Sequence, residues 1–299
     1  MNLDWLFNGY LRCMAALGRF AGRHGAKSHG ERLADAGTNV DLSGLSYEAA
    51  DEMAVKYGNR YRSLGIAIGL LGIAIVFLAI APTGFSLEGQ LVQVVAVAKV
   101  VLMVAMLLIV WFGERSRINR SWIALRLHAE ALRYAKLRDA LQAFRDTRSP
   151  AHDAALRAEL VRVLDGDEGQ IAYNAGKKAQ YEAIERFSDV LLWFSLGLAI
   201  FGAVGHLFLH WSWAIFLTAF LPAMVGGIHG INGFLSVGGL AWAHERTHEK
   251  LLEVRDELDH ADDPQGQALL DVGSEALTIL TSRDARWKVA AEKGKLKPA

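Results

Sequence analysis

The sequence has one cysteine and no formal net charge, and each of these two features excludes something. The single Cys13 cannot form an intramolecular disulfide, so nothing in the chain requires an oxidising compartment. A balanced charge carries no sign of the basic surface that nucleic acid needs, so we expect no nucleic-acid partner. A Walker loop, a Rossmann fingerprint, a G-x-S-x-G elbow and a Cys-x-x-Cys pair are all missing, so no soluble catalytic domain is expected.

Charged residues make up 21% of the chain and are strongly segregated. Residues 64–113 and 190–243 contain almost none of them, which is typical of a membrane protein. These stretches predict four transmembrane helices in two hairpins, at about 64–81 and 90–113 and at about 190–211 and 213–243. The expected fold class is therefore all-α: an integral membrane protein with cytoplasmic helical extensions.

Two of the predicted spans need comment at their inner ends. The run 213–243 would be about 45 Å long as one straight helix, so we expect a kink or a part outside the bilayer. Pro222 and a group of glycines are the expected cause of the kink. These glycines are Gly226, Gly227, Gly230 and Gly233. The span at 90–113 is expected to continue into the next helix without a break.

Lysines and arginines flank all four predicted spans on one side, and none occurs in the connections around 82–89 and 206–212. The flanking residues are Lys56, Arg60, Arg62, Arg115, Arg117, Arg120, Lys177, Lys178, Arg186, Arg246 and Lys250. Because basic residues are retained in the cytoplasm, this side is predicted to be cytoplasmic. Both termini are then cytoplasmic, and the lipid bilayer is the first partner.

The pattern divides the chain into five parts. They are an amphipathic cytoplasmic segment at 1–45, a first hairpin with a long cytoplasmic helix at 46–146, a helical connector at 147–186, a second hairpin with a helical extension at 187–260, and a cytoplasmic helix and tail at 261–299. Ser149 and Pro150 are a typical N-cap and first-turn pair and predict the start of a short helix. The two hairpin units suggest a weak internal duplication.

The segment His244 to His248 fits the H-E-x-x-H pattern. On a helix this spacing places His244 and His248 on one face for zinc, with Glu245 as a general base. A zinc site needs a third protein ligand, and none arrives from another predicted element. A solvated, charged helix end explains the five residues as well, so no cofactor is expected and zinc stays the alternative.

Among the polar residues inside predicted spans, Lys99, His229 and Asn232 are the functional candidates. Ionisable groups within spans are functional candidates by default. Lys99 lies about 13 Å inside its span by helical rise. It either extends its ammonium group to the outer interface or lines a polar path or pore together with His229 and Asn232.

Two stretches, Ala54 to Gly65 and Arg120 to Arg133, resemble bacterial membrane proteins related to the SLATT group. In those proteins a helix with the pattern R-W-x-x-x-R-x-x-A-E-x-L-R follows a hairpin. Ser121 replaces the leading arginine here, and the matching residues are Trp122, Arg126, Ala129, Glu130, Leu132 and Arg133. The C-terminal tail is also similar, through Trp287, Lys295, Leu296 and Pro298.

The resemblance implies a membrane effector of a bacterial conflict or anti-phage defence system, in the inner membrane and oligomeric. It also implies a trigger, which a cytoplasmic sensor protein or a nucleotide ligand would supply. For Trp122, Arg126, Glu130 and Arg133, with Trp287, a structural network that docks one helix on its neighbour is the simpler interpretation. An H-E-x-x-H membrane metalloprotease and a non-enzymatic scaffold are the competing functions, and a function without catalysis is favoured.

Overall fold

The computed structural model describes residues 40–42, 44–166, 169–210, 212–261 and 266–293. Within them the chain is helical and has no strand, as the sequence predicts. The helices are α2 (Tyr47–Gly84), α3 (Gln90–Arg115), α4 (Ile118–Arg133), α5 (Ala135–Asp146), α6 (Pro150–Asp165), α7 (Gln170–Leu209), α8 (Ser212–Phe234), α9 (Val237–His260) and α10 (Gln267–Lys293). Ser149 caps α6 by accepting a hydrogen bond from the His152 N–H, and Pro150 lies in the first turn, so the predicted helix start is confirmed.

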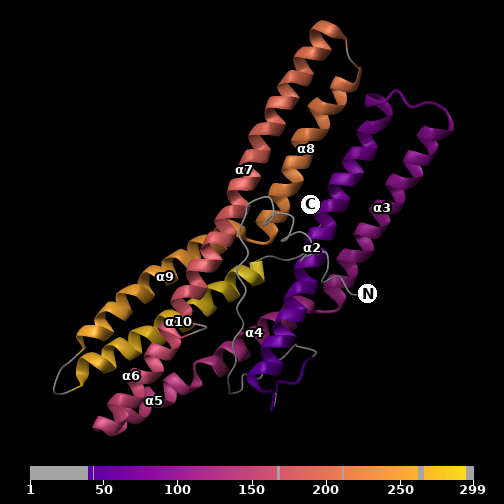
Figure 1. The fold of residues 1–299 in the computed structure, drawn as a ribbon. Helices are drawn as coiled ribbons and strands as arrows, with labels where there is room; N and C mark the ends of the chain where they lie inside the picture. The colour runs from indigo at the N-terminus through magenta and orange to yellow at the C-terminus, as the bar shows by residue number, and fades with distance from the viewer. Residues whose placement is uncertain (1–39, 43, 167–168, 211, 262–265, 294–299) are drawn as a thin grey trace.

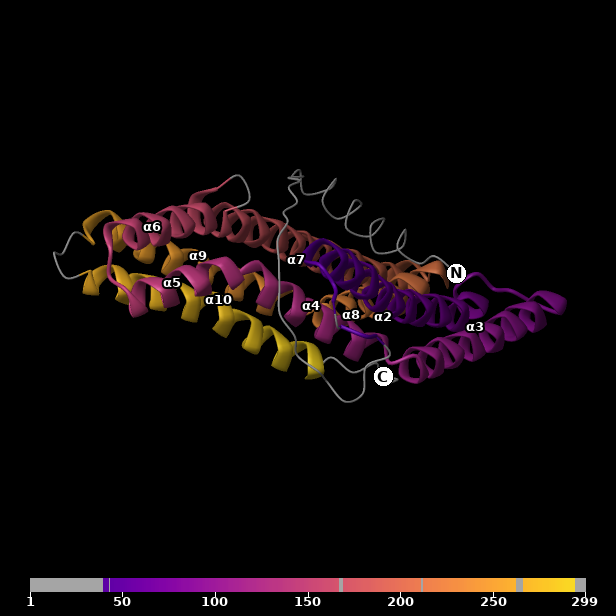
Figure 2. The same cartoon turned by 90° about the horizontal axis from the view of Figure 1, so that it is seen from below.

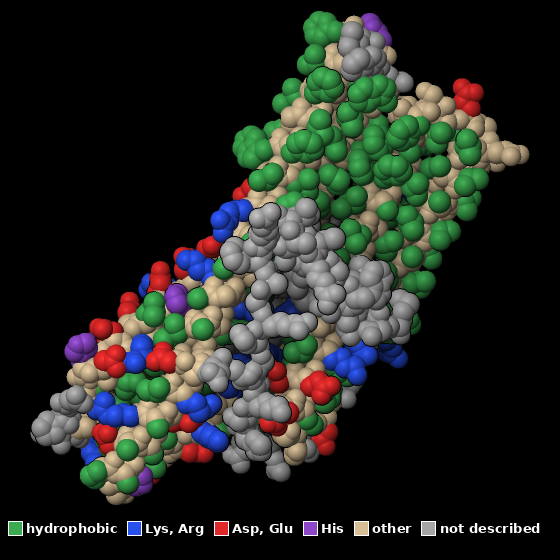
Figure 3. All heavy atoms as spheres, in the orientation of Figure 1, with side chains coloured by type: hydrophobic (Ala, Val, Ile, Leu, Met, Phe, Trp, Pro, Cys, Tyr) green, Lys and Arg blue, Asp and Glu red, His purple; other side chains and the backbone are tan. Residues whose placement is uncertain are grey.

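Four helices, α2, α3, α7 and α8, contain stretches long and apolar enough to cross a membrane. They lie side by side in the order α7, α8, α2, α3, and the row does not close on itself (Figures 1 and 2). Within the described residues α3 contacts α2 and α4, whereas α7 contacts α8, α9 and α6. This apolar half is covered by hydrophobic side chains, and the charged side chains gather on the other half (Figure 3).

The two halves are joined by helices of two kinds. With 38 and 40 residues, α2 and α7 run unbroken through both halves. In contrast, α3 and α8 stop at the boundary, where Arg117 and Ser236 take left-handed conformations with φ of 49° and 53°. Such values are uncommon for residues other than glycine and turn the chain sharply.

These breaks correct two sequence-based expectations. The helix after α3 is not continuous with it, because α3 ends at Arg115 and α4 begins at Ile118. The stretch 213–243 is not one kinked helix either. Here α8 passes through Pro222 and ends at Phe234, and the change of direction comes at Ser236. The backbone conformation of single residues at the boundary, rather than proline, redirects the chain.

The charged half has a core that four helices share. Leucine-rich faces of α5, α6, α9 and α10 meet in it, with Leu137, Leu160, Leu251 and Leu269 almost fully buried. Above this core α4 lies along α2, and α9 lies along α7 (Figure 1). Apolar residues at helical spacing explain this packing, because burying one stripe of each helix stabilises the bundle.

The units α2–α3–α4 and α7–α8–α9 follow one plan. Each has a long continuous helix, an apolar neighbour that ends at a left-handed residue, and a following helix that packs back on the first. The sequence offset that relates Arg117 to Ser236 also relates buried positions of the two following helices. These are Ile118 and Val237, Trp122 and Ala241, and Leu132 and Leu251. The arrangement has the form of the internal duplication suggested by the sequence.

Candidate functional site

Four charged residues and a tyrosine join α2 to α4, and we call them the α2–α4 clamp. Arg126 Nη1 donates a hydrogen bond to Asp51 Oδ1 at 2.9 Å and also pairs with Glu130. Arg133 Nη1 pairs with Glu130 Oε2 at 3.3 Å, and its Nε donates to the Tyr47 hydroxyl at 3.2 Å. Positions 126, 130 and 133 share one helix face because they are spaced by four and three residues.

Glu130 is the most buried of the four charged residues in the clamp. Its side chain is 2% exposed, whereas those of Arg126 and Arg133 are 23% and 16% exposed. Burial is the largest single effect and lowers the pKa of Arg133, but the Glu130 carboxylate together with Tyr134 and Tyr47 outweighs it and leaves this pKa well above the ordinary value. A carboxylate at such depth is stable only with cations beside it. The clamp therefore holds fixed charges, which suits docking better than proton transfer.

Trp122 connects the clamp helices to α8. Its indole packs over Gly58 of α2, where an added Cβ would lie 2.6 Å from Nε1. The Arg62 guanidinium lies 4.9 Å from the ring centroid. Tyr61 bridges onward, with centroid distances of 5.6 Å to Trp122 and 5.2 Å to Phe234, the last residue of α8. A shift of α4 would therefore be transmitted through these contacts to the break between α8 and α9.

In the second unit the H-E-x-x-H segment occupies the corresponding place. His244 Nδ1 is 2.7 Å from Asn174 Oδ1, and His248 Nδ1 is 3.2 Å from the Ile171 carbonyl oxygen. Glu245 pairs with Lys178 of α7 at 2.5 Å. We call Asn174, Lys178, His244, Glu245 and His248 the α7–α9 clamp. Because both imidazoles bond to α7, this segment has a clear role in docking α9.

The same geometry bears on the zinc hypothesis. Nδ1 of His244 and Nδ1 of His248 are both engaged, which leaves only the Nε2 atoms as candidate ligands. No group of three His, Cys, Asp or Glu residues that could hold a metal occurs in the described part of the chain. Zinc binding, with Glu245 as base, stays an untested alternative, and the described residues offer it no third ligand.

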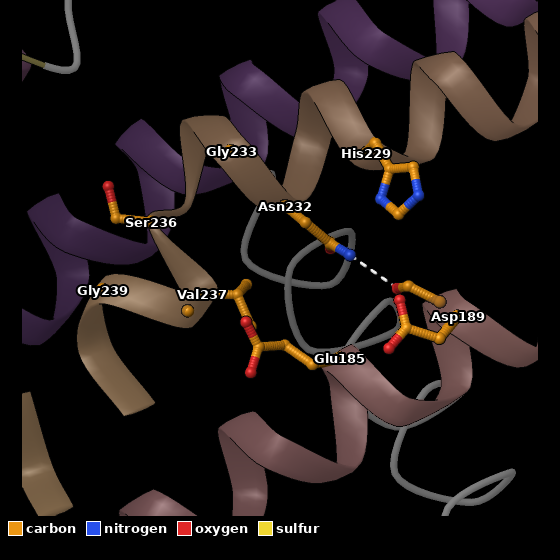
Figure 4. Close-up of a pocket in the computed structure, with 10 residues that line it drawn as sticks. Glu185, Asp189, His229, Asn232, Gly233, Ser236, Val237 and Gly239 are labelled. Carbon is orange, nitrogen blue, oxygen red and sulfur yellow. Dashed lines mark hydrogen bonds between the residues drawn. The ribbon is translucent and has the colours of Figure 1, made fainter. Parts of the chain in front are cut away.

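A polar groove lies at the boundary between α7, α8 and the start of α9 (Figure 4). Its volume is about 610 Å³. Asn232 Nδ2 donates to Ser188 Oγ at 2.6 Å, which ties α8 to α7 inside the groove. The side chains that line it are Glu185, Ser188, Asp189, His229, Asn232, Ser236 and Val237. His229 and Asn232, three residues apart on α8, both line this groove, and their role in a polar path stays a prediction.

Lys99 is not part of this groove. It belongs to α3, which contacts α2 and α4 in the described structure, whereas α8 contacts α2, α7 and α9. Lys99 is half-buried and falls on a stripe of half-buried positions, Val95, Lys99, Leu102, Met106 and Ile109, at the spacing of a helix face that packs on α2. One chain therefore does not bring Lys99 to His229 and Asn232.

Sequence reasoning found the α4 half of the first clamp and missed its α2 half. Tyr47 and Asp51 are spaced by one helical turn, and that spacing was the available signal. Glu185 and Asp189 were also missed, although they are one turn apart just before the apolar run of α7. The side chain of Trp287 and the tail residues Lys295, Leu296 and Pro298 lie outside the described residues.

Comparison with known proteins yields one finding. Residues 46–139 match a family model described as a protein of unknown function, DUF4231. Neither a curated protein nor a solved structure matches the chain. The matched segment begins at the N-cap of α2 and ends within α5, so it contains the whole α2–α4 clamp. The first unit of this protein is therefore similar to the DUF4231 family.

Proposed function

We propose that the protein is a membrane effector of a bacterial defence system, channel-like in action and triggered through its cytoplasmic helices. It crosses the inner membrane four times, as the hairpins α2–α3 and α7–α8, with the charged half and both termini in the cytoplasm. The surface of the apolar half supports insertion. Val97 and Trp111 of α3 are each 63% exposed, and Trp193 and Phe208 of α7 are 69% and 70% exposed. A water-soluble monomer rarely exposes so much contiguous apolar surface.

The observation that carries the proposal is the continuity of α2 and α7. Each passes from the charged half into the apolar half without a break, and each is clamped to the helix that follows its neighbouring span. A ligand or partner that shifts α4 or α9 would therefore also move α2 or α7, and each of these helices continues into the bilayer. The Trp122–Tyr61–Phe234 contacts extend that coupling from the first unit to the second.

The defence role is supported by the resemblance of the first unit to SLATT-related proteins, which falls inside the matched segment 46–139. Channel-like action needs more than one copy, because the described spans of one chain form an open row. The trigger is assigned to a cytoplasmic sensor protein or a nucleotide ligand.

Ion release from lipid vesicles that contain the purified protein tests this function. The variant Arg126→Gln breaks the α2–α4 clamp, and we expect it to raise basal release well above that of the wild type. Arg246→Gln is the control, since the Arg246–Glu249 pair is 53% exposed on both sides and should leave release unchanged. The wild type and the variants are compared at equal protein content. If Arg126→Gln vesicles release ions no faster than vesicles without protein, the effector function is contradicted and the scaffold is favoured.

A further inference from the structure

One face of α8 carries small residues that contact no other part of the chain among the residues that the structure describes. Gly65, Gly69 and Gly227 are used within the chain, since a Cβ added at any of them would clash with Phe234, Ile231 or Ile73. Gly226, Gly230 and Gly233 are different. They are exposed, and an added Cβ there would find nothing within 4 Å.

Small residues in membrane spans let two helices approach closely. The first set does so between α2 and α8. The second set offers the same kind of surface on another face of α8, with a helix-sized partner missing from the described chain. We call this surface the open glycine face.

The open glycine face leads directly into the polar groove, because Gly233 lines both (Figure 4). Two exposed carboxylates, Glu185 and Asp189, lie in the groove on the α7 side. Arg186 is nearby in sequence, but its guanidinium pairs with Glu182 at 3.5 Å. The open glycine face is therefore acidic at its end near the boundary, where α8 ends.

Helix α3 has complementary properties. It is the most exposed of the four apolar helices, with 6% of its apolar stretch buried. Exposed arginines at positions 115, 117 and 120 follow its apolar stretch. Both α3 and α8 run toward the boundary and end there at a left-handed residue, so the arginines lie at the depth of the groove.

We propose that copies of this chain associate head to tail, with α3 of one copy packed on the open glycine face of the next and its arginines at Glu185 and Asp189. The contact is heterologous, because one copy offers α3 and the other offers α8 with α7. Repetition of such a contact closes a ring or extends a row. The proposal rests on membrane insertion as stated under the proposed function, and not on ion release.

Charge exchange tests the contact. The first variant carries Arg115→Glu and Arg120→Glu, and the second carries Glu185→Lys and Asp189→Lys. Each places like charges in the contact, so we expect association to weaken by roughly tenfold or more. A third variant carries all four changes, which restores opposite charges, and it should assemble like the wild type. The size of the assembly is measured by light scattering in a mild detergent and by crosslinking in native membranes.

A steric variant tests the glycine face independently of charge. Gly230→Leu should reduce the assembly to single chains without lowering the melting temperature of the chain, because nothing lies near its Cβ. Gly176→Leu, at an exposed glycine of α7 outside the apolar half, is the matched control and should assemble normally.

The outcomes separate this inference from the proposed function. Wild-type protein that is a single chain in membranes, or a fourfold variant that does not reassemble, would overturn the head-to-tail contact. Normal assembly of both charge variants and of Gly230→Leu would overturn it too. If assembly follows the expected pattern but no variant releases ions, the contact stands and only the proposed function fails.

Discussion

Single residues of the two clamps do the same work with different chemistry. In the first unit Asp51, Arg126, Glu130 and Arg133 use full charges. In the second unit a single ion pair, Lys178–Glu245, is joined by two imidazole hydrogen bonds, one of them between His244 and the fully buried Asn174. Buried charges are costly unless each has its partners, whereas neutral hydrogen bonds tolerate the loss of a partner better.

Among the charged residues of the α2–α4 clamp, Glu130 is the one whose loss should leave the most uncompensated buried charge. Glu130→Gln removes the carboxylate shared by two guanidiniums, so Arg126 and Arg133 would repel each other in a half-buried site. Fully buried pairs cost about 3–5 kcal/mol when broken, and the partial exposure of the arginines lowers our expectation to roughly 2 kcal/mol. The melting temperature in one detergent should fall by several degrees. Glu249→Gln, in an exposed pair, is the control, and an equal effect in both would contradict the role of Glu130.

His244 and His248 give opposite expectations for docking and for zinc. His244→Ala loses the Asn174 bond and the stacking on Tyr181, whose ring lies 5.9 Å away, and should destabilise the chain by roughly 1–3 kcal/mol. Metal analysis of purified protein should show no stoichiometric zinc in the wild type, His244→Ala or His248→Ala. His260→Ala serves as the control, because the Nδ1 of this exposed histidine bonds to the Asp256 carbonyl oxygen of its own helix. Stoichiometric zinc that both mutations abolish would restore the metalloprotease hypothesis.

At the scale of helices, the sequence predicted the apolar stretches well and the breaks poorly. Uncharged runs identify α2, α3, α7 and α8, because the hydrophobicity of a segment can be read from its own residues without knowing what it packs against. The breaks at Arg117 and Ser236 depend on two left-handed residues that are neither glycine nor proline, and no composition signal marks them. The α2 half of the first clamp carries only the one-turn spacing of Tyr47 and Asp51 as a signal, and the sequence does not show which helix they pair with, since pairing across helices is a tertiary property.

Helix packing between the units depends on glycine. Gly69→Ala would place a Cβ 2.3 Å from Ile231 Cγ1, and overpacking of this kind costs about 1–3 kcal/mol. Gly72→Ala is the matched control, since nothing lies within 4 Å of its Cβ, and should leave the melting temperature unchanged or slightly higher. Ile231→Ala should rescue part of the Gly69→Ala loss in a double-mutant cycle. Strict additivity of the two changes would show that α2 and α8 do not pack here.

For the whole molecule, the sequence established the helical class and four candidate spans, and it left their lateral order open. Lys99 illustrates the limit. Its depth along α3 follows from the sequence, but only the order of the helices in the row shows that it lies away from His229 and Asn232. Charge and hydropathy fix depth in a bilayer, and they carry no information about which span is next to which.

Orientation is the prediction that belongs to this scale. Reporter fusions at Ala299 and near Thr147 should both report the cytoplasm, and a fusion near Gly84 should report the outside, because all basic flanks lie on one side. Fusions after residue 39, where the described structure begins, give an internal control for the N-terminal side. An external signal near Thr147 would overturn the assignment of α2 and α3 as a hairpin.

The unequal chemistry of the two clamps has a consequence for how the units loosen. Dissolved salt screens the ion pairs that make up most of the α2–α4 clamp, whereas in the α7–α9 clamp it screens the Lys178–Glu245 pair and has little effect on the hydrogen bonds of His244 and His248. As ionic strength rises, amide hydrogens of α4 should therefore exchange with deuterium sooner than those of α9. The two units thus share one plan, and yet they should loosen at different salt concentrations.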